Sequence, residues 1–458
     1  MVTPSSEAIL RLALGTDLAN GELLLNQMVP HLSSAAEPEA AGATVPKRVS
    51  SESLRGLDGF AFFVADIQTG WGPFVAAYLT SVGWLQFDIG LILTIGTMTA
   101  FVLQVPVGAV VDAVPRKRLL AGTAVACISA SALVLAAWPS FGPVVVAKLL
   151  HGVASCLVGP TMAAISLGLV GHRLLSVRLG RNARFLSLGN AIAAGVMGII
   201  GYYFTNRAIF MLTAALGVPT VVALASIRSA DIDPDLARGG RPRDQMHPSS
   251  DALRSLAGNR PLVIFAGAML LFQLANAAAL PTMAGLLAAR LPKSATLILS
   301  VCIFAPQFVV AAIAPAVGRR AETWGRRPLL ALCLSALAVR CAFFAVTSAP
   351  ALVIAVQLLD GISAATLGVL VPLVLADVMR GTGHYNLAQG VVGAAVGIGA
   401  SVSTAVAGYI SDHVGSSGTF LFMAAAAATG LLLVIALMPE TKGSGETAGA
   451  TTTLSPTS

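Results

Sequence analysis

Five ionisable side chains lie inside long apolar stretches of this 458-residue chain: Asp66, Lys148, His151, Arg340 and Asp360. A charged group at the centre of a bilayer costs about 2.5–3.5 kcal/mol on insertion scales, so each of these residues needs a partner or a role. Carboxylate, amine and imidazole groups at such depth are typical of proton relays in membrane proteins. We therefore take Asp66, Lys148, His151 and Asp360 as candidates for proton coupling.

The spacing of these residues indicates which of them can act together. Lys148 and His151 are three positions apart, so they lie on one face of a helix. A pair of Lys148 with Asp66 or with Asp360 would form a proton-coupling unit inside a helical bundle. The same pair would also serve as a static ion pair that closes the bundle, and the sequence leaves both roles open.

The elements that hold these residues are long runs of apolar residues. The chain is 56% hydrophobic and 11% charged, with a mean hydropathy of +0.82, whereas soluble domains carry roughly 25% charged residues. The runs are continuous and about 20 residues long, which fits spanning helices and excludes the alternating pattern of a membrane β-barrel. We predict an all-α polytopic membrane protein of about twelve spans, at residues 59–83, 90–111, 119–137, 144–170, 185–204, 208–227, 262–289, 295–317, 329–347, 351–379, 386–410 and 419–438.

Lysine and arginine residues are concentrated in alternate loops between these runs. The loops on the opposite side hold only Arg207, Arg290 and Lys293. Because cytoplasmic loops carry the excess of Lys and Arg, we predict that both ends of the chain are cytoplasmic in a plasma or inner cell membrane. The net charge of +7 therefore reports topology, and no binding of nucleic acid is expected.

A loop phrase occurs twice, 210 residues apart, and divides the chain into halves. Each copy has a glycine, an acid four positions later, and paired cations four positions after the acid. Its residues are Gly108, Asp112, Arg116 and Lys117 in the first copy and Gly318, Glu322, Gly325, Arg326 and Arg327 in the second. Other pairs match at nearly the same offset, such as Gln68 with Asn276, each five residues before a proline. A tandem duplication of this kind predicts two six-span bundles that move against one another.

The duplicated phrase resembles the loop motif of the major facilitator superfamily, which lies between the second and third helices of that family and again between the eighth and ninth. The family pattern is Gly, small or apolar residues, Asp, a basic residue, Gly, and then Arg with Arg or Lys. The first copy keeps Asp112 but has Pro115 in place of the later glycine, whereas the second keeps Gly325 but has Glu322 in place of aspartate. The resemblance covers about residues 57–440.

The resemblance implies that the two loop phrases hold the cytoplasmic side shut, and the unequal copies predict an asymmetric latch. An acid at a helix end can accept hydrogen bonds from the N-terminus of a neighbouring helix or from arginine. The alternative is that these charges only fix topology.

Lys148 and His151 match the family's fourth-helix motif of Arg, two residues, Gln and Gly. In the family the first, fourth, seventh and tenth helices face the central cavity. This implies four candidates for the cavity wall, although interhelical hydrogen bonding accounts for each equally well: Gln68, Gln273, Asn276 and Gln357. The ninth helix is peripheral in the family, so for Arg340 we expect a structural partner or a side chain that reaches the membrane surface.

The function implied by the resemblance is secondary active transport by alternating access. We expect proton-coupled movement of a small organic molecule, with efflux slightly favoured. The alternative is proton-coupled uptake, in which the chain acts as a sugar or organic-acid symporter. A membrane sensor that uses residues 1–56 as its output arm is the rival interpretation. The sequence contains no nucleotide-binding loop, metal constellation or nucleophile–base arrangement, so we expect no enzyme activity, cofactor or metal. The expected partners are a small-molecule substrate, protons and membrane lipids, and the chain is expected to be a monomer.

Five segments follow from these patterns. Residues 1–56 form a partly disordered cytoplasmic extension, residues 228–260 a flexible cytoplasmic linker, and residues 440–458 a disordered tail, while the two bundles occupy residues 57–227 and 261–439. The five cysteines all fall inside apolar runs without a metal-binding spacing, so we expect them to be small buried hydrophobic residues.

Overall fold

The computed structural model describes residues 49–69, 71, 73–240, 249–290 and 295–442. These residues form helices and, within the described ranges, no strand. The helices of the first half are α3 (Ser51–Thr69), α4 (Pro73–Ser81), α5 (Gln86–Ala113), α6 (Lys117–Ala137), α7 (Phe141–Tyr203) and α8 (Asn206–Ala225). The second half contains α9 (Ser249–Gly258), α10 (Arg260–Asn276), α11 (Ala279–Arg290), α12 (Ala295–Trp324), α13 (Arg326–Val346), α14 (Pro350–Val378), α15 (Tyr385–His413) and α16 (Ser416–Leu437).

The helices account for the predicted membrane spans. Among the described residues, ten helical stretches are long and apolar enough to cross a membrane. One of them, α7, is two helices that meet at Gly171, where φ is 64° and ψ is 178°. Helices α3 and α4 together take the place of the first predicted span. Counting α7, one of these ten stretches, as two spans, and adding α3 with α4 as one more span, gives the twelve spans expected from the sequence.

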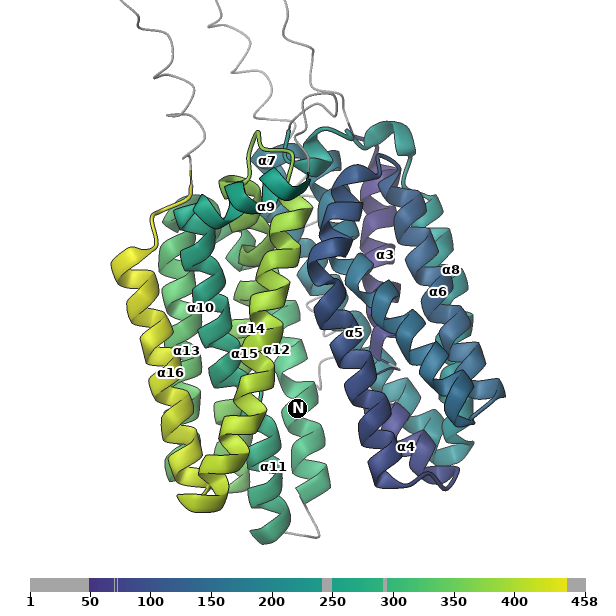
Figure 1. The fold of residues 1–458 in the computed structure, drawn as a ribbon, viewed down its shortest axis with the longest axis vertical. Coiled ribbons are helices and arrows are strands. Elements are labelled where there is room, and N and C mark those ends of the chain that lie inside the picture. Colours follow the sequence, from purple (N-terminus) through teal and green to yellow (C-terminus); the bar gives the residue numbers. More distant parts are fainter. Residues whose placement is uncertain (1–48, 70, 72, 241–248, 291–294, 443–458) are drawn as a thin grey trace, which may run out of the picture. The chain divides into compact units, whose positions relative to one another are not determined.

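Two helical bundles lie side by side (Figure 1), α3–α8 in purple and blue and α10–α16 in green and yellow. They meet along α5 with α15 and along α7 with α12. Glycines allow this approach, because a Cβ on Gly108 of α5 would collide with the Asn386 carbonyl oxygen, and a Cβ on Gly318 of α12 with that of Ser176. On α15, Gly390 has the same packing role, because its Cβ would collide with the backbone of α5.

The structure corrects three predicted boundaries. The first helix begins at Ser51, eight residues before the predicted span, because Ser50 and Ser53 bond to Asp231 and order its first turn. Residues 228–240 of the predicted flexible linker are packed against the bundle, and Ala237 there is fully buried. The ordered chain also extends past Met438, since Glu440 bonds to the start of α13.

Further predictions about the ends and the cysteines have mixed outcomes. Residues 1–48 and 443–458, which hold most of the predicted extension and tail, lie outside the described residues. Four cysteines, Cys156, Cys302, Cys333 and Cys341, are buried without a disulfide, as predicted, while Cys127 is half-buried.

Candidate gate and polar clusters

The carboxylate of Asp112 joins the two bundles at one end of the molecule. Asp112 is the second-last residue of α5 and is 2% exposed. Its Oδ1 accepts hydrogen bonds from the backbone N of Asn386 (3.1 Å) and from Asn386 Nδ2 (2.7 Å), and its Oδ2 accepts one from Leu387 N (2.8 Å). An acid at the N-terminus of a helix is also stabilised by the helix dipole. The predicted contact of this acid with a neighbouring helix N-terminus is thus present, and that helix is α15.

We call this end, where α5 ends and α6 and α13 begin, the basic end. The close approaches between the bundles lie in the halves of the helices nearer to it. On α5 and α15 they run from Gly108 against Asn386 to Gly397 against Phe101. Helices α7 and α12 approach at Gly180, where a built Cβ would lie 2.6 Å from the carbonyl oxygen of Ala314.

The second copy of the loop phrase makes a different set of contacts. Arg326 is 4% exposed, and its Nε donates to Asp377 Oδ2 (2.9 Å) while its Nη2 donates to Glu322 Oε1 (3.2 Å). Both acids belong to the same bundle as Arg326, since Glu322 lies on α12 and Asp377 on α14. The first copy therefore connects the bundles, whereas the contacts of Glu322 stay within one. Gly325 of the second copy has φ of 92°, which explains the glycine at this turn.

The linker after α8 adds a third component to the Asp112 contact. It contains the short 3₁₀ helices η2 (Ser229–Asp231) and η3 (Leu236–Arg238). Asn386 Nδ2 also donates to the carbonyl of Ala237 (3.2 Å), and Gly381 N donates to that of Gly239. The linker residues between α8 and Gly240 thus contact both bundles at the basic end.

A polar and aromatic cluster lies where α3 meets α7 in the first bundle. The Ser155 hydroxyl bonds to Gln68 Oε1 (3.2 Å) and to His151 Nε2 (3.1 Å). The His151 ring stacks on Trp71, with centroids 4.1 Å apart, and Lys148 Nζ lies 5.4 Å from the centre of the same indole. The structure therefore brings together Gln68, Lys148 and His151 of the predicted site residues, and it adds Trp71.

The second bundle holds a related cluster where α10, α13 and α14 meet. Arg340 is 2% exposed and donates to the carboxylate of Asp360 and to Oδ1 of Asn276. Asn276 Nδ2 lies 3.5 Å from Gln273 Oε1, and the buried Oε1 of Gln357 has no hydrogen-bond partner among the described residues. The structural partner expected for Arg340 is thus present.

The predicted ion pairs of Lys148 are not formed in this structure. Asp360 pairs with Arg340, and within the described residues neither Asp66 nor Asp360 lies within 4.0 Å of the Lys148 amine. Asp66 is 4% exposed, and its Oδ1 has no hydrogen-bond partner in the described part of the chain. This carboxyl packs toward Gly189 of α7, where a Cβ would lie 3.1 Å from Oδ1. Burial of a carboxylate without a partner is unfavourable unless it takes up a proton.

A cavity of about 260 Å³ lies between the bundles, on the basic side of these clusters. Its polar lining comes from Gln104, Asn182 and Gln389. The four cavity candidates derived from the first, fourth, seventh and tenth helices do not line it. Asn182 is fixed by Arg178, which in turn pairs with Asp58 of α3 at 2.6 Å. Arg178 and Asn182 are four positions apart in the sequence, which places them on one face of a helix. This spacing is the sequence feature from which their contact could have been predicted.

The sequence pattern that defines the Major Facilitator Superfamily matches residues 59–305 and 277–456. The chain belongs to this family. It is 38% identical over 399 residues to MT2531 and to Rv2456c, uncharacterized MFS-type transporters of Mycobacterium tuberculosis strains CDC 1551 and H37Rv, covering 87% of the chain and 94% of each relative. Membership implies an integral membrane protein that performs secondary transport of small molecules, and the family is one of transporters rather than enzymes.

Two solved structures share the fold. The human organic anion transporter MFSD10 (TETRAN) has a TM-score of 0.64 at 16% identity, covering 86% of the chain and all of MFSD10. The transporter FucP, in its outward conformation, has a TM-score of 0.68 at 14% identity, covering 83% of the chain and 97% of FucP. The predicted all-α architecture of two bundles is confirmed by these similarities.

Proposed function

We propose that this family member is a proton-coupled transporter of a small organic molecule, with both termini in the cytoplasm of the cell and the basic end on the cytoplasmic side. The observation that carries the proposal is Asp66, a buried carboxyl group whose Oδ1 lacks a hydrogen-bond partner among the described residues. A group of this kind at membrane depth gains from binding a proton while it is buried and from releasing it when water enters. Movement of the bundles would provide that change of surroundings.

Alternating access requires the two ends to open in turn. In this structure the bundles are joined at the basic end by Asp112, Asn386 and the linker. This arrangement supports an outward-facing state, closed toward the cytoplasm, and the similarity to FucP in its outward conformation agrees with it. Release of the three bonds to Asp112 would allow the cytoplasmic side to open.

The substrate would bind between the cluster on α3 and α7 and the cluster on α10, α13 and α14. The first presents amide, aromatic and cationic groups, and the second presents amides and the Arg340–Asp360 pair; the repeat relates Gln68 to Asn276 and His151 to Asp360. Such a site suits a small polar organic molecule, and efflux from the cytoplasm is the direction that we favour.

The test is transport by the purified protein in proteoliposomes, using a ligand found by a thermal-shift screen. With wild-type protein, a pH gradient should drive accumulation of the ligand. Asp66→Asn should abolish this accumulation but retain exchange of labelled for unlabelled ligand, because exchange needs no net proton movement. Asp88→Asn, which removes a half-buried carboxylate near the start of α5, is the matched control and should leave both activities unchanged. Proton-driven accumulation by Asp66→Asn at the wild-type level would refute the proposed role.

A further inference from the structure

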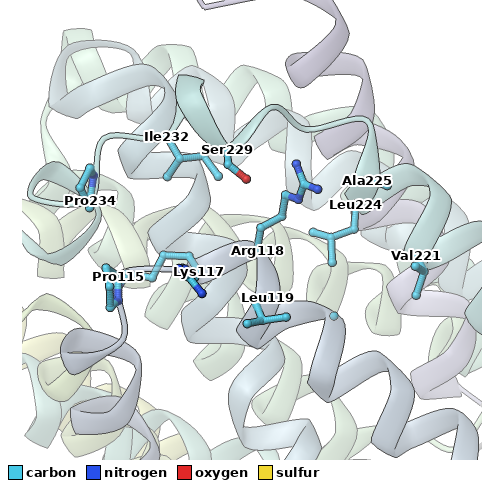
Figure 2. A pocket seen from close by; sticks show the side chains of 12 residues that line it. Pro115, Lys117, Arg118, Leu119, Val221, Leu224, Ala225, Ser229, Ile232 and Pro234 are labelled. Atoms are coloured by element: carbon cyan, nitrogen blue, oxygen red, sulfur yellow. The ribbon is translucent and has the colours of Figure 1, made fainter.

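A cavity of about 680 Å³ opens at the basic end of the first bundle. Figure 2 shows that its side chains come from the start of α6, the end of α8 and the linker. Arg118 extends from α6 toward Leu224 of α8, with Ser229 and Ile232 of the linker beside it. The cavity is separate from the polar clusters described above, and the transport cycle proposed here does not use it.

The lining of this cavity is cationic on one side and apolar on the other. Arg116, Lys117 and Arg118 are consecutive, and the described residues contain no ion pair for any of them. Within the described ranges no acid lines the cavity, and no side chain caps the first turn of α6. The positive end of the helix dipole therefore adds to the charge of the arginines. Leu119 and Val221 are 62% and 43% exposed, and they extend the lining toward the surface of the bundle.

The equivalent place in the second bundle is occupied by a carboxylate of the chain itself. Arg118 donates to the carbonyl of Ile227, as Arg327 donates to that of Ile435, so the two helix starts correspond in the repeat. At α13, Glu440 accepts hydrogen bonds from Arg326 N (2.8 Å) and Arg327 N (3.1 Å). Gly325 leaves room for this carboxylate, which a Cβ at that position would strike.

The first bundle has an acid near the corresponding point of its linker, but that acid is directed elsewhere. Oδ2 of Asp231 accepts hydrogen bonds from the hydroxyls of Ser50 and Ser53, both at 2.7 Å. Asp231 therefore fixes the start of α3, and none of the acids in the described part of the chain occupies the start of α6. The repeat thus indicates that an anion from outside the chain completes the first site.

We propose that this cavity binds an anionic phospholipid. The headgroup phosphate would contact Arg116, Arg118 and the backbone N–H groups of the first turn of α6, and an acyl chain would lie along Leu119 and Val221. Basic pockets between helices at the membrane surface select lipid headgroups in this way, and the exposed apolar side chains favour a lipid over a soluble phosphate. The proposal depends on membrane insertion and not on proton coupling.

The bound lipid would act on the gate through Lys117. This residue lines the cavity, is 1% exposed, and donates to the carbonyl of Val111 at the end of α5, next to Asp112. A phosphate beside the α6 start would hold Lys117 and the linker in the arrangement that keeps Asp112 bonded to α15. Anionic lipid should therefore stabilise the state that is closed at the basic end.

The test measures thermal unfolding in a neutral detergent while phosphatidylglycerol, phosphatidylcholine or soluble glycerol phosphate is added. Phosphatidylglycerol should raise the Tm of the wild-type protein, and the other two should not. The double variant Arg116→Gln, Arg118→Gln should need at least about ten times as much phosphatidylglycerol for the same rise of the Tm. The control Arg319→Gln, Arg320→Gln removes the same charge from exposed sites at the same end and should respond like wild type.

Three results would overturn the proposal. Equal losses in the two double variants would indicate diffuse attraction of lipid to a basic surface. A rise of the Tm with glycerol phosphate equal to that with phosphatidylglycerol would indicate a soluble-anion site. An unchanged lipid response of the Arg116, Arg118 variant would exclude these arginines. A Tm without lipid that stays near the wild-type value shows that the variant folds, and binding of one phosphatidylglycerol by native mass spectrometry gives a second measure.

Discussion

The substitution Asp112→Asn should open the basic end of the protein. The carboxylate accepts three hydrogen bonds from Asn386 and Leu387, and a charged acceptor makes each worth about 1.5–3 kcal/mol. The asparagine oxygen can take the place of Oδ1 and keep two of the three as a neutral acceptor, while its amide nitrogen faces the Leu387 N–H. Loss of the Leu387 bond and weakening of the other two by the neutral acceptor together shift the equilibrium between closed and open states by about 3 kcal/mol, which is a factor on the order of 100.

The matched control is Glu322→Gln in the second copy of the loop phrase. The Glu322 side chain is 38% exposed, and its pair with Arg326 lies within one bundle. Partly exposed pairs of this kind contribute about 0–1 kcal/mol, and this pair does not join the bundles. We therefore expect a change in the open population of less than about fivefold.

Cysteine labelling can measure both variants. Gly159 lines the cavity between the bundles, and a Cβ there meets no atom within 4 Å, so Gly159→Cys is a compatible reporter in a background without the native cysteines. A membrane-impermeant maleimide applied from the basic end should label the Asp112→Asn protein on the order of 100 times faster. The rate for comparison is that of Gly159→Cys with Asp112 and Glu322 intact. Labelling of the Asp112→Asn protein at that rate, or equal rates for Asp112→Asn and Glu322→Gln, would refute the asymmetric gate.

Three further predictions concern stability and pH. Arg340→Met should lower the free energy of unfolding by about 3–5 kcal/mol because it leaves the Asp360 carboxylate without its cationic partner. The double variant Arg340→Met, Asp360→Leu should recover most of this lost stability, as measured by thermal unfolding. Glu440→Ala should lower stability by about 0.5–2 kcal/mol through loss of the α13 cap, whereas truncation after Lys442 should not change the Tm. Hydrogen bonds from Ser50 and Ser53 lower the pKa of Asp231 below its usual 3.8. The linker should therefore stay protected from proteases down to pH 4 and lose this protection as the pH drops through the lowered pKa. In Asp231→Asn the protection should be absent even at neutral pH.

The fold followed from the sequence because its signals are local. Apolar runs of bilayer length and a repeated loop phrase fix the helices and the two halves without knowledge of any tertiary contact. The contact of Asp112 with a helix N-terminus was also predictable in kind. Its partner Asn386 was not, because the two residues are 274 positions apart and no motif marks that asparagine.

The pairing of the buried charges depends on helix rotation, which the sequence does not encode locally. Asp360 was a candidate partner of Lys148, but α13 turns Arg340 inward to meet it. The linker was predicted to be flexible from its polar composition, yet its backbone bonds to Gly168 and its side chains bond to α3. Composition cannot detect such contacts, because each uses single atoms of residues that are also common in loops.

The most direct test of alternating access with an asymmetric gate measures two distances between spin labels by double electron–electron resonance, with the protein in nanodiscs. One pair of spin labels, on Ala113 and Arg380, spans the bundles at the basic end, and another, on Trp138 and Val414, spans them at the opposite end; all four residues are exposed. With Asp112→Asn, the first distance should lengthen and the second should shorten. Two distances that stay unchanged, or that move in the same direction, would contradict the account.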